Sequence, residues 1–300
     1  MLTDGRPLLD SLNAALWRLL FGPVGRIVPF GWARAMARPL AAIAWRLGLR
    51  RAITERNLLL AFPEWSPERR SDVARASFVN LFTVFLELPI LRHLSDHALR
   101  RRLRVENLEL LRAIGPGGAL LLSAHFGNWE LLALGAAAIS GVPFTIVAKS
   151  QRDYGALERM RTSRGNRLIP TSRAAREASG ILRSGGVVAM LADQSASGRD
   201  ALVEMFSIPT YTFSAPARLA LRYRPTIIVG FAVRGVEGDY TVRLEELAHA
   251  DLPDTEEGAR ILTQRYIDRL EAVIREHPEQ WVWQHRKWKN TPGISYEGLR

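Results

Sequence analysis

Residues 120–132 read Leu120-Leu-Leu-Ser-Ala-His125-Phe-Gly-Asn-Trp-Glu130-Leu-Leu, and this stretch decides the fold. An apolar run of strand length ends near His125, and Gly127 begins a turn. Asn128 can then cap a helix whose first turn contains Glu130. In open α/β sheets, ligands bind at the carboxyl ends of the strands. We therefore expect His125 and Glu130 to face one cleft.

A histidine paired with a carboxylate suits proton transfer near neutral pH. A hydroxyl is a poor nucleophile until a base takes its proton, and histidine contributes roughly a hundred- to ten-thousand-fold to such a step. The carboxylate of Glu130 would hold one ring nitrogen of His125 protonated and leave the other free. A His-x4-Glu spacing by itself is a weak signal, since most histidines are structural. The strand-turn-helix context strengthens it.

Short apolar runs alternate with helical patterns along the rest of the chain. Near-continuous apolar strands separated by helices predict an α/β fold with a mainly parallel central sheet covered by helices. A turn at 235–239 would join the last long strand to a hairpin partner at 240–244, and Ser66-Pro67-Glu68 has the composition of a helix start. The expected strands are 119–123, 144–148, 167–169, 187–191 and 226–233, and a long helix is expected at 255–276.

Two amphipathic segments open the chain. One apolar face carries Leu8, Leu12, Leu16 and Leu19, and a second carries Trp32, Met36, Leu40, Ile43 and Leu47. Arginine and tryptophan accompany both faces, as in helices that lie in a membrane interface, although ordinary core helices share the pattern. We divide the chain into an N-terminal membrane-associating helical segment, 1–50, and a single α/β domain, 51–300. The uncharged stretch 131–148 is broken at Ser140-Gly-Val-Pro143, which favours buried core over a membrane span.

Composition restricts the partners. The net charge is +11, from 41 Lys and Arg against 30 Asp and Glu, which indicates an anionic partner such as lipid head groups or an acidic carrier protein. The excess charge is dispersed and no nucleic-acid-binding motif is present, so no nucleic-acid partner is expected. The chain has no cysteine, which excludes disulfides, a thiolate nucleophile and zinc-thiolate sites.

Several motifs resemble the lysophospholipid-acyltransferase-like enzymes, in particular the late (lauroyl and myristoyl) acyltransferases of lipid A biosynthesis. Ser123–Glu130 resembles their His-x4-Asp/Glu motif, and Asp193-Gln194 follows a strand as their Asp-Gln/His segment does. Segments 56–66 and 277–289 resemble their upstream and C-terminal motifs; the second contains His277-Pro-Glu-Gln-Trp-Val-Trp-Gln-His-Arg-Lys-Trp-Lys289. The resemblance covers nearly the whole chain.

The resemblance implies a membrane-associated O-acyltransferase. An acyl thioester, on acyl-carrier protein or coenzyme A, would donate the acyl chain to a hydroxyl of a membrane lipid acceptor, a lipid A precursor or related glycolipid. His125 and Glu130 carry over as the catalytic dyad. No metal and no cofactor beyond the thioester co-substrate is expected. The expected location is the anionic surface of the cytoplasmic face of the bacterial inner membrane, with peripheral or monotopic attachment or a single N-terminal anchor.

Other residues are weaker candidates for substrate binding. Arg164 resembles a family arginine thought to meet the acceptor, Arg152 lies nearby in sequence, and both have a solvated-surface alternative. Asp193 either orients a substrate or caps a turn, and amides near Asn128 could hold negative charge. Phe206 and Pro209-Thr210 line an acyl channel or pack in the core. His285, with the cations 286, 287 and 289, is expected to form a basic, tryptophan-flanked surface.

Alternative functions remain open. The acceptor could be another lysolipid, a phosphatidylinositol mannoside or an ornithine lipid, or water could replace the acceptor in thioester hydrolysis. A non-enzymatic membrane-binding protein on the same fold is a further alternative, which the intact His125 and Glu130 pair disfavours. Acyl-chain length, acceptor identity and donor type depend on a pocket that the sequence does not define.

Overall fold

The computed structural model describes residues 20–149 and 155–299. The first predicted amphipathic face, from Leu8 to Leu19, and the candidate Arg152 lie outside the described residues. The rest of this subsection concerns the described part of the chain.

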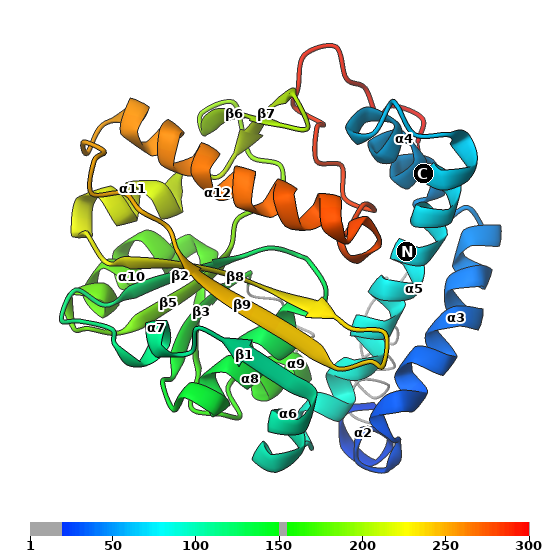
Figure 1. Ribbon diagram of the computed structural model, residues 1–300, viewed down its shortest axis with the longest axis horizontal. Coiled ribbons are helices and arrows are strands. Elements are labelled where there is room, and N and C mark those ends of the chain that lie inside the picture. Colours follow the sequence, from blue (N-terminus) through cyan, green and yellow to red (C-terminus); the bar gives the residue numbers. More distant parts are fainter. Residues whose placement is uncertain (1–19, 150–154, 300) are drawn as a thin grey trace, which may run out of the picture.

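A seven-stranded sheet forms the centre of the protein (Figure 1). Its strand order is β1-β9-β8-β2-β5-β3-β4, and a separate antiparallel pair, β6 and β7, lies beside it. The five strands from β8 to β4 run parallel, whereas β9 pairs antiparallel with β8. The strands are β1 (Leu103–Glu106), β2 (Ala119–Ser123), β3 (Phe144–Ala148), β4 (Arg167–Pro170), β5 (Val187–Leu191), β6 (Ala201–Met205), β7 (Ile208–Thr212), β8 (Thr226–Arg234) and β9 (Tyr240–Glu246).

Helices cover both faces of this sheet and one of its ends. The helical segments are η1 (Leu20–Val24), α2 (Gly25–Ile27), α3 (Phe30–Arg46), α4 (Arg51–Ala61), α5 (Pro67–Leu91), α6 (Asp96–Arg102), α7 (Glu109–Arg112), α8 (Trp129–Ser140), α9 (Gly155–Arg161), η2 (Thr171–Arg173), α10 (Ala174–Arg183), α11 (Ala215–Tyr223), α12 (Glu256–Glu276) and η3 (Pro278–Gln280). In Figure 1, α10, α11 and α12 lie on one side of the sheet, and α8 and α9 lie on the other. The helices α3, α4 and α5 flank one end.

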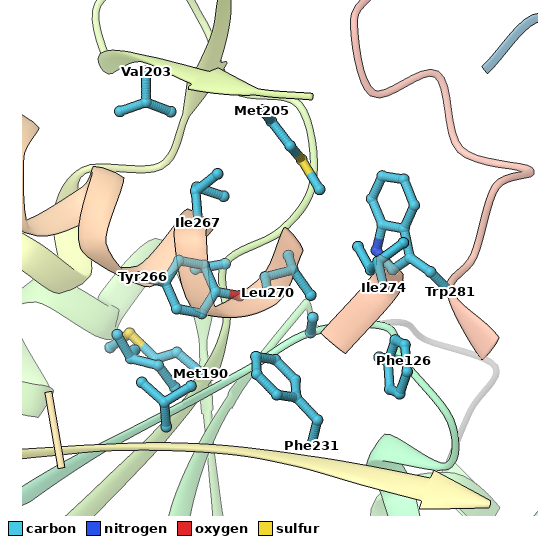
Figure 2. Packing of buried hydrophobic residues seen from close by; sticks show 14 of the residues in the cluster. Phe126, Met190, Val203, Met205, Phe231, Tyr266, Ile267, Leu270, Ile274 and Trp281 are labelled. Carbon is cyan, nitrogen blue, oxygen red and sulfur yellow. The ribbon is translucent and has the colours of Figure 1, made fainter. Parts of the chain in front are cut away.

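The side chains of the central strands point alternately to the two faces of the sheet, and an apolar core lies on each face. In β2, Leu120 and Leu122 belong to the core on the α12 side, whereas Ala119 and Leu121 belong to the core on the α8 side. Successive side chains of a strand point to opposite faces, so a strand buried on both faces must be apolar throughout. Figure 2 shows the first core, in which Tyr266 and other α12 residues pack onto the sheet.

The predicted fold class is confirmed. The strands predicted at 119–123, 144–148 and 187–191 have these bounds in the structure, and those at 167–169 and 226–233 are one residue longer. The sequence prediction missed β1, β6 and β7. The stretch 131–148 is α8, a turn and β3, as expected for buried core.

The helix α5 begins as the sequence predicts. Ser66 caps it by accepting a hydrogen bond from the amide of Arg69 at 3.2 Å, and Pro67 occupies the first helical position. Within residues 20–149 and 155–299, α5 is also the one helix long and apolar enough to cross a membrane, but 56% of its apolar window is buried inside the protein. Its packing against α3, α8 and α9 is that of a core helix.

The second predicted amphipathic face lies on α3 and its C-terminal end and is exposed. Trp32, Ile43 and Leu47 have exposed fractions of 61%, 52% and 68%, and Met36 and Leu40 lie on the same face. The opposite face, with Ala33, Ala37, Ala41 and Ala44, is buried against α5. The alanines of α3 therefore face the core together with Phe30 and Trp45, while the other large apolar side chains point to the outside.

The C-terminal segment corrects one prediction. His285 with the cations 286, 287 and 289 was expected to form a basic, tryptophan-flanked surface, yet Lys287 and the flanking Trp281, Trp283 and Trp288 are all at least 98% buried. The three indoles pack edge-to-face, with ring centroids of Trp281 and Trp283 4.7 Å apart. Burial of such large apolar areas stabilises the fold strongly. Lys287 is buried together with its neighbour Trp288. Phe206 and Thr210 are also buried, and Phe206 packs against Trp283 in this core.

Candidate active site

The turn that carries His125 is held by two distant segments. The amide of Gly127 donates to the carbonyl oxygen of Gln280 at 2.8 Å, and that of Val282 donates to the carbonyl oxygen of His125 at 3.1 Å. Gly127 has a φ of +54°, and a Cβ there would lie 1.7 Å from the carbonyl oxygen of Ala232. Only glycine satisfies both requirements. The C-terminal segment and β8 therefore fix the backbone from which the histidine projects.

Asp193 contacts the histidine ring. The two residues follow the ends of the neighbouring strands β2 and β5, and Oδ1 of Asp193 lies 2.8 Å from Nδ1 of His125. The other oxygen, Oδ2, accepts from the amide of His125 and from Nε1 of Trp281, both at 3.1 Å. This contact corrects the expectation that Glu130 orients the ring. Residue order along the chain suggested Glu130, but the register of adjacent parallel strands brings Asp193 to Nδ1.

The electrostatics of this pair favour an ionised Asp193. Burial by itself would raise the pKa of Asp193, but His125, Trp281 and the buried Lys287 lower it to about 2. Burial opposes the imidazolium of His125, yet the carboxylate of Asp193 outweighs that effect, and the pKa of His125 is raised. A carboxylate that accepts from the Nδ1–H of the ring leaves Nε2 unprotonated, as the acceptor nitrogen of the imidazole. Nε2 accepts a long hydrogen bond, 3.4 Å, from the side-chain amide of Gln194, a residue that also lines the pocket described below.

Glu130 forms an ion pair with Arg161. Its carboxylate accepts from Nε of Arg161 at 2.8 Å and from Nη2 of the same guanidinium, which makes the contact bidentate. Glu130 lies in the first turn of α8 and Arg161 ends α9, so the pair joins two helices on one side of the sheet. Both residues line the same pocket as His125, and both act on the histidine through space.

A largely apolar pocket of about 780 Å³ opens at His125. Its walls come from strands β2 to β5 and from α8 and α9, and its polar lining consists of Ser123, His125, Glu130, Lys149, Glu158, Arg161, Thr171, Arg173 and Gln194. The apolar lining consists of Leu121, Trp129, Leu132, Ala133, Ile146, Val147, Ala148, Leu157, Leu168, Ile169, Pro170, Ala189, Met190, Leu191 and Phe213. A pocket of this size and character has room for a small apolar ligand beside the imidazole.

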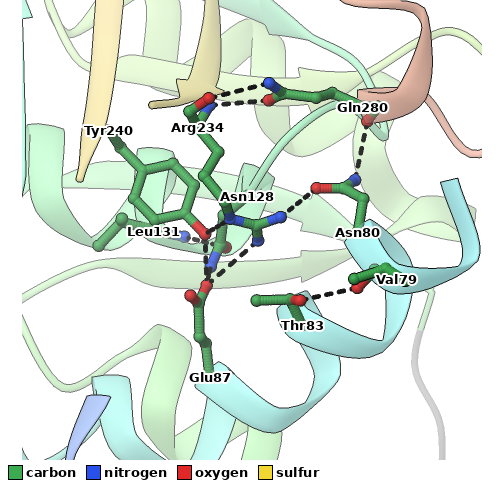
Figure 3. Close-up of polar contacts among 9 residues, drawn as sticks. All are labelled: Val79, Asn80, Thr83, Glu87, Asn128, Leu131, Arg234, Tyr240 and Gln280. Atoms are coloured by element: carbon green, nitrogen blue, oxygen red, sulfur yellow. Dashed lines mark hydrogen bonds and ion pairs between the residues drawn. The ribbon is translucent and has the colours of Figure 1, made fainter. Parts of the chain in front are cut away.

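Asn128 holds the start of α8 and belongs to a buried hydrogen-bond network. It caps α8 by accepting from the amide of Leu131 at 2.9 Å, as predicted, and its side-chain nitrogen donates to Glu87 at 2.6 Å. Figure 3 shows the buried network around it, in which Tyr240 and Arg234 also contact Glu87. Burial raises the pKa of Glu87. Asn128 is fully buried and is not among the pocket-lining residues, which corrects its expected contact with substrate.

Arg164 does not reach the pocket either. Its guanidinium contacts the carboxylate of Asp96 and the carbonyl oxygen of Leu94, so it ties the loop after α9 to α6. Arg159 and Arg167 line a second, more open groove of about 950 Å³ between α9 and α10 along β4, the edge strand. That groove does not include His125, so we place the chemistry in the smaller pocket. Arg152, the remaining candidate, lies outside the described residues.

Sequence reasoning missed several residues of this site. Gln194 and Trp281 lie in segments that had been noted, but neither had been given a contact with the histidine or its carboxylate. Lys287 lies fully buried with its ammonium donating to Oγ1 of Thr212 at 3.1 Å, and burial lowers its pKa to about 8. Asp193 had been a candidate for orienting a substrate, and one signal could have identified it as the partner of His125. It follows its strand at the same offset as His125, and such positions meet when two parallel strands pair in register.

Comparison with known proteins shows the family of this chain. The chain is similar to a curated protein named lipid A biosynthesis acyltransferase from Haemophilus influenzae, with 25% identity over 294 residues that cover 94% of this chain and 90% of the relative. The family model of bacterial lipid A biosynthesis acyltransferases matches residues 6–290. The match includes the His125 turn, Asp193 and nearly all of the buried C-terminal segment. This chain is therefore an acyltransferase and belongs to the bacterial lipid A biosynthesis acyltransferase family.

Proposed function

We propose that this protein transfers a fatty acyl chain from an acyl thioester to a hydroxyl of a lipid A precursor or a related glycolipid. The observation that carries the proposal is the apolar pocket that opens at Nε2, the unprotonated nitrogen of His125, with Asp193 behind Nδ1. The pocket suits the acyl chain, and the imidazole suits removal of the acceptor proton.

The proposed reaction proceeds by direct attack. Nε2 of His125 takes the proton of the acceptor hydroxyl while that oxygen bonds to the thioester carbonyl carbon. Asp193 stabilises the imidazolium and keeps the ring in the orientation that exposes Nε2. The tetrahedral intermediate then collapses, the carbon–sulfur bond breaks, and the thiolate leaves with the proton from the imidazolium. An ester and a free thiol are the products, and no covalent enzyme intermediate is needed.

Glu130 has a different role in this proposal. Since Arg161 occupies both of its oxygens, we propose that Glu130 shapes the pocket entrance and balances charge near His125. The amides at the start of α8 remain candidates for holding negative charge that develops at the thioester carbonyl.

We propose attachment to the cytoplasmic face of the bacterial inner membrane through the exposed face of α3. Trp32, Ile43 and Leu47 project outward beside Arg34 and Arg46, a combination that suits the boundary between acyl chains and anionic head groups. A peripheral or monotopic attachment of this kind would let the pocket meet a lipid acceptor without a membrane-spanning segment in the described residues.

The donor is proposed to be acyl-carrier protein or acyl-coenzyme A. Both are anionic, and the net charge of +11 favours their approach over that of a cationic partner. The two donors differ in size, so they are distinguished by offering each with the same acyl chain.

The test measures transfer of a radiolabelled acyl chain in mixed micelles. A lipid A precursor and lysophospholipids are offered side by side to the wild type, His125→Ala, Glu130→Ala and Asp193→Asn. Label in the saccharide lipid that is lost in His125→Ala and strongly reduced in Asp193→Asn supports the proposal. Label only in lysophospholipid means a different acceptor, and release of free fatty acid without any acceptor means thioester hydrolysis. Equal activity in His125→Ala and wild type overturns the mechanism.

A further inference from the structure

Ser123 carries a buried hydroxyl without a partner. The residue ends β2, and only 4% of it is exposed. Its Oγ has no hydrogen-bond partner among residues 20–149 and 155–299. The backbone carbonyl oxygen of Ser123 is occupied, because it accepts from the hydroxyl of Tyr266 at 2.7 Å and from the amide of Ala192 at 3.2 Å. The side chain is thus the one part of this residue left unsatisfied.

Other buried serines differ in this respect. Oγ of Ser77 donates to the carbonyl oxygen of Ala74 at 2.7 Å, and Oγ of Ser179 donates to that of Arg176 at 2.8 Å. A buried hydroxyl without a partner destabilises a folded protein, so such groups are uncommon and point to a ligand where they face a cavity.

Ser123 is one of the residues that line the pocket at His125. Side chains two residues apart on a strand point to the same face, so Ser123 lies on the side of the sheet that carries Leu121 and Ala119. Leu121, Ser123 and His125 all line the pocket of about 780 Å³. Along this strand and the turn after it, the lining therefore changes in order from apolar to hydroxyl to imidazole, with about 6.6 Å between successive strand side chains on one face.

We propose that Ser123 is a further substrate-contacting residue, whose hydroxyl donates a hydrogen bond to the carbonyl oxygen of the bound acyl thioester. This inference rests on the proposed function. The order of the lining matches the order of the reacting groups: hydrocarbon chain at Leu121, carbonyl at Ser123 and acceptor hydroxyl at His125. When the acceptor oxygen attacks, the carbonyl oxygen gains negative charge, and the hydrogen bond strengthens as that charge develops.

In this proposal the hydroxyl of Ser123 binds the thioester carbonyl and not the acceptor lipid. A hydroxyl that bound the acceptor would alter acceptor affinity, whereas one that stabilises the oxyanion acts mainly on kcat. The hydroxyl forms no covalent bond in this scheme, because His125 activates the acceptor directly and Ser123 lies before the imidazole in the pocket.

The test compares Ser123→Ala with Ser179→Ala, which removes a partnered hydroxyl from α10 outside the pocket lining. In Ser123→Ala we expect kcat to fall by about 100-fold, the usual loss on removing one donor to an oxyanion. Its KM for the acceptor should change little, and its melting temperature should stay equal to or above that of the wild type, since an unpaired hydroxyl has been removed. Ser179→Ala should keep the wild-type kcat with a slightly lower melting temperature. Ser123→Thr should keep more kcat than Ser123→Ala.

Two outcomes overturn the inference. One is a Ser123→Ala enzyme with a kcat within twofold of the wild type. The other is a loss of kcat together with a clear fall in melting temperature, which would indicate a packing role. Both are read against an active wild type and an inactive His125→Ala. A wild type that transfers no acyl chain at all overturns the proposed function itself, and the inference with it.

Discussion

Nδ1 of His125 lies 2.8 Å from Oδ1 of Asp193, a residue 68 positions later in the chain. The proximity follows from strand register. Ser123 and Leu191 are paired in the parallel ladder of β2 and β5, and His125 and Asp193 each come two residues later. The pairing of β2 with β5 therefore brings His125 and Asp193 into contact.

Replacement of Asp193 tests this relationship. Asp193→Asn keeps the size of the side chain but removes its charge, and its amide can stabilise the wrong tautomer of His125. We expect kcat to fall by roughly 100- to 10,000-fold, with a smaller change in KM, as in other His–Asp pairs. Steady-state kinetics on purified enzyme measure this, and circular dichroism checks the fold. A fall of less than threefold would remove Asp193 from the mechanism.

The pH dependence follows from the same pair. A general base must be neutral, and the pKa of His125 is raised above its ordinary value of 6.5. We therefore expect kcat/KM to decline as pH falls below that raised pKa. In Asp193→Asn, burial dominates because the opposing carboxylate charge is gone, so the declining limb should move to lower pH. A full pH profile of both enzymes measures the shift, and movement of the limb to higher pH would contradict the assignment.

Glu130 and Arg161 are expected to act on His125 with opposite signs. Glu130 raises the pKa of His125 and Arg161 lowers it. The limb of the pH profile should therefore move to lower pH in Glu130→Gln and to higher pH in Arg161→Gln, and return near the wild type in the double variant. Each single variant leaves one buried partner unpaired, so it should lose stability near the lower end of roughly 3–5 kcal/mol, since Arg161 is partly exposed.

Denaturant unfolding measures that loss for the ion pair. The double variant should regain part of the stability, because neither charge is then left without its partner. Additive losses in the double variant would show that the two side chains do not interact.

Trp281 should influence the histidine through Asp193. Trp281→Phe keeps most of the buried ring but removes the donor to Oδ2 of Asp193. The carboxylate then accepts more strongly from His125, so the pKa of His125 should rise further and kcat/KM at neutral pH should fall by about 3- to 10-fold. NMR titration of the His125 imidazole, assigned with His125→Gln, measures the pKa without substrate.

Trp288→Phe provides the matched control for Trp281→Phe. Trp288 packs in the same aromatic cluster, and its Nε1 has no hydrogen-bond partner within the described residues. Loss of that N–H should leave the pKa of His125 unchanged. Equal pKa shifts in the two variants would indicate altered packing and not the lost hydrogen bond.

Membrane binding should depend on the exposed face of α3. Ile43→Ser removes an aliphatic side chain that is 52% exposed, and we expect about a tenfold weaker partition onto anionic vesicles, or ~1.4 kcal/mol. Leu202→Ser on β6, at a residue 45% exposed, is the control and should bind as the wild type does. Vesicle co-sedimentation measures both, and equal loss in the two variants would place the contact elsewhere.

Most of the central sheet could be predicted because its strands carry their own signal. The strands β2, β3 and β5 are apolar on both faces and bounded by turn residues, and their predicted bounds were confirmed. The strand β1 was missed because it has four residues and follows the arginine-rich end of α6. The pair β6 and β7 was missed because each strand has only five residues and β7 contains Pro209.

The C-terminal segment illustrates the opposite case. Its cations and tryptophans indicated a membrane-facing surface, but Lys287 and Trp288 are buried. Composition does not say which side of an aromatic cluster faces water. That depends on α12, α4 and the sheet, which close around the segment only in the folded chain.

Local sequence was enough to predict the α/β class, the five central strands and the cap of α8, and to single out His125 as a candidate, because each depends on neighbours within a few residues. Tertiary structure decided which carboxylate serves the histidine. Glu130 is near in sequence but is held by Arg161, whereas Asp193 reaches Nδ1 through the register of two strands. It also decided that Ser123 lines the pocket without a partner. Such contacts join residues far apart in the chain, and no local pattern encodes them.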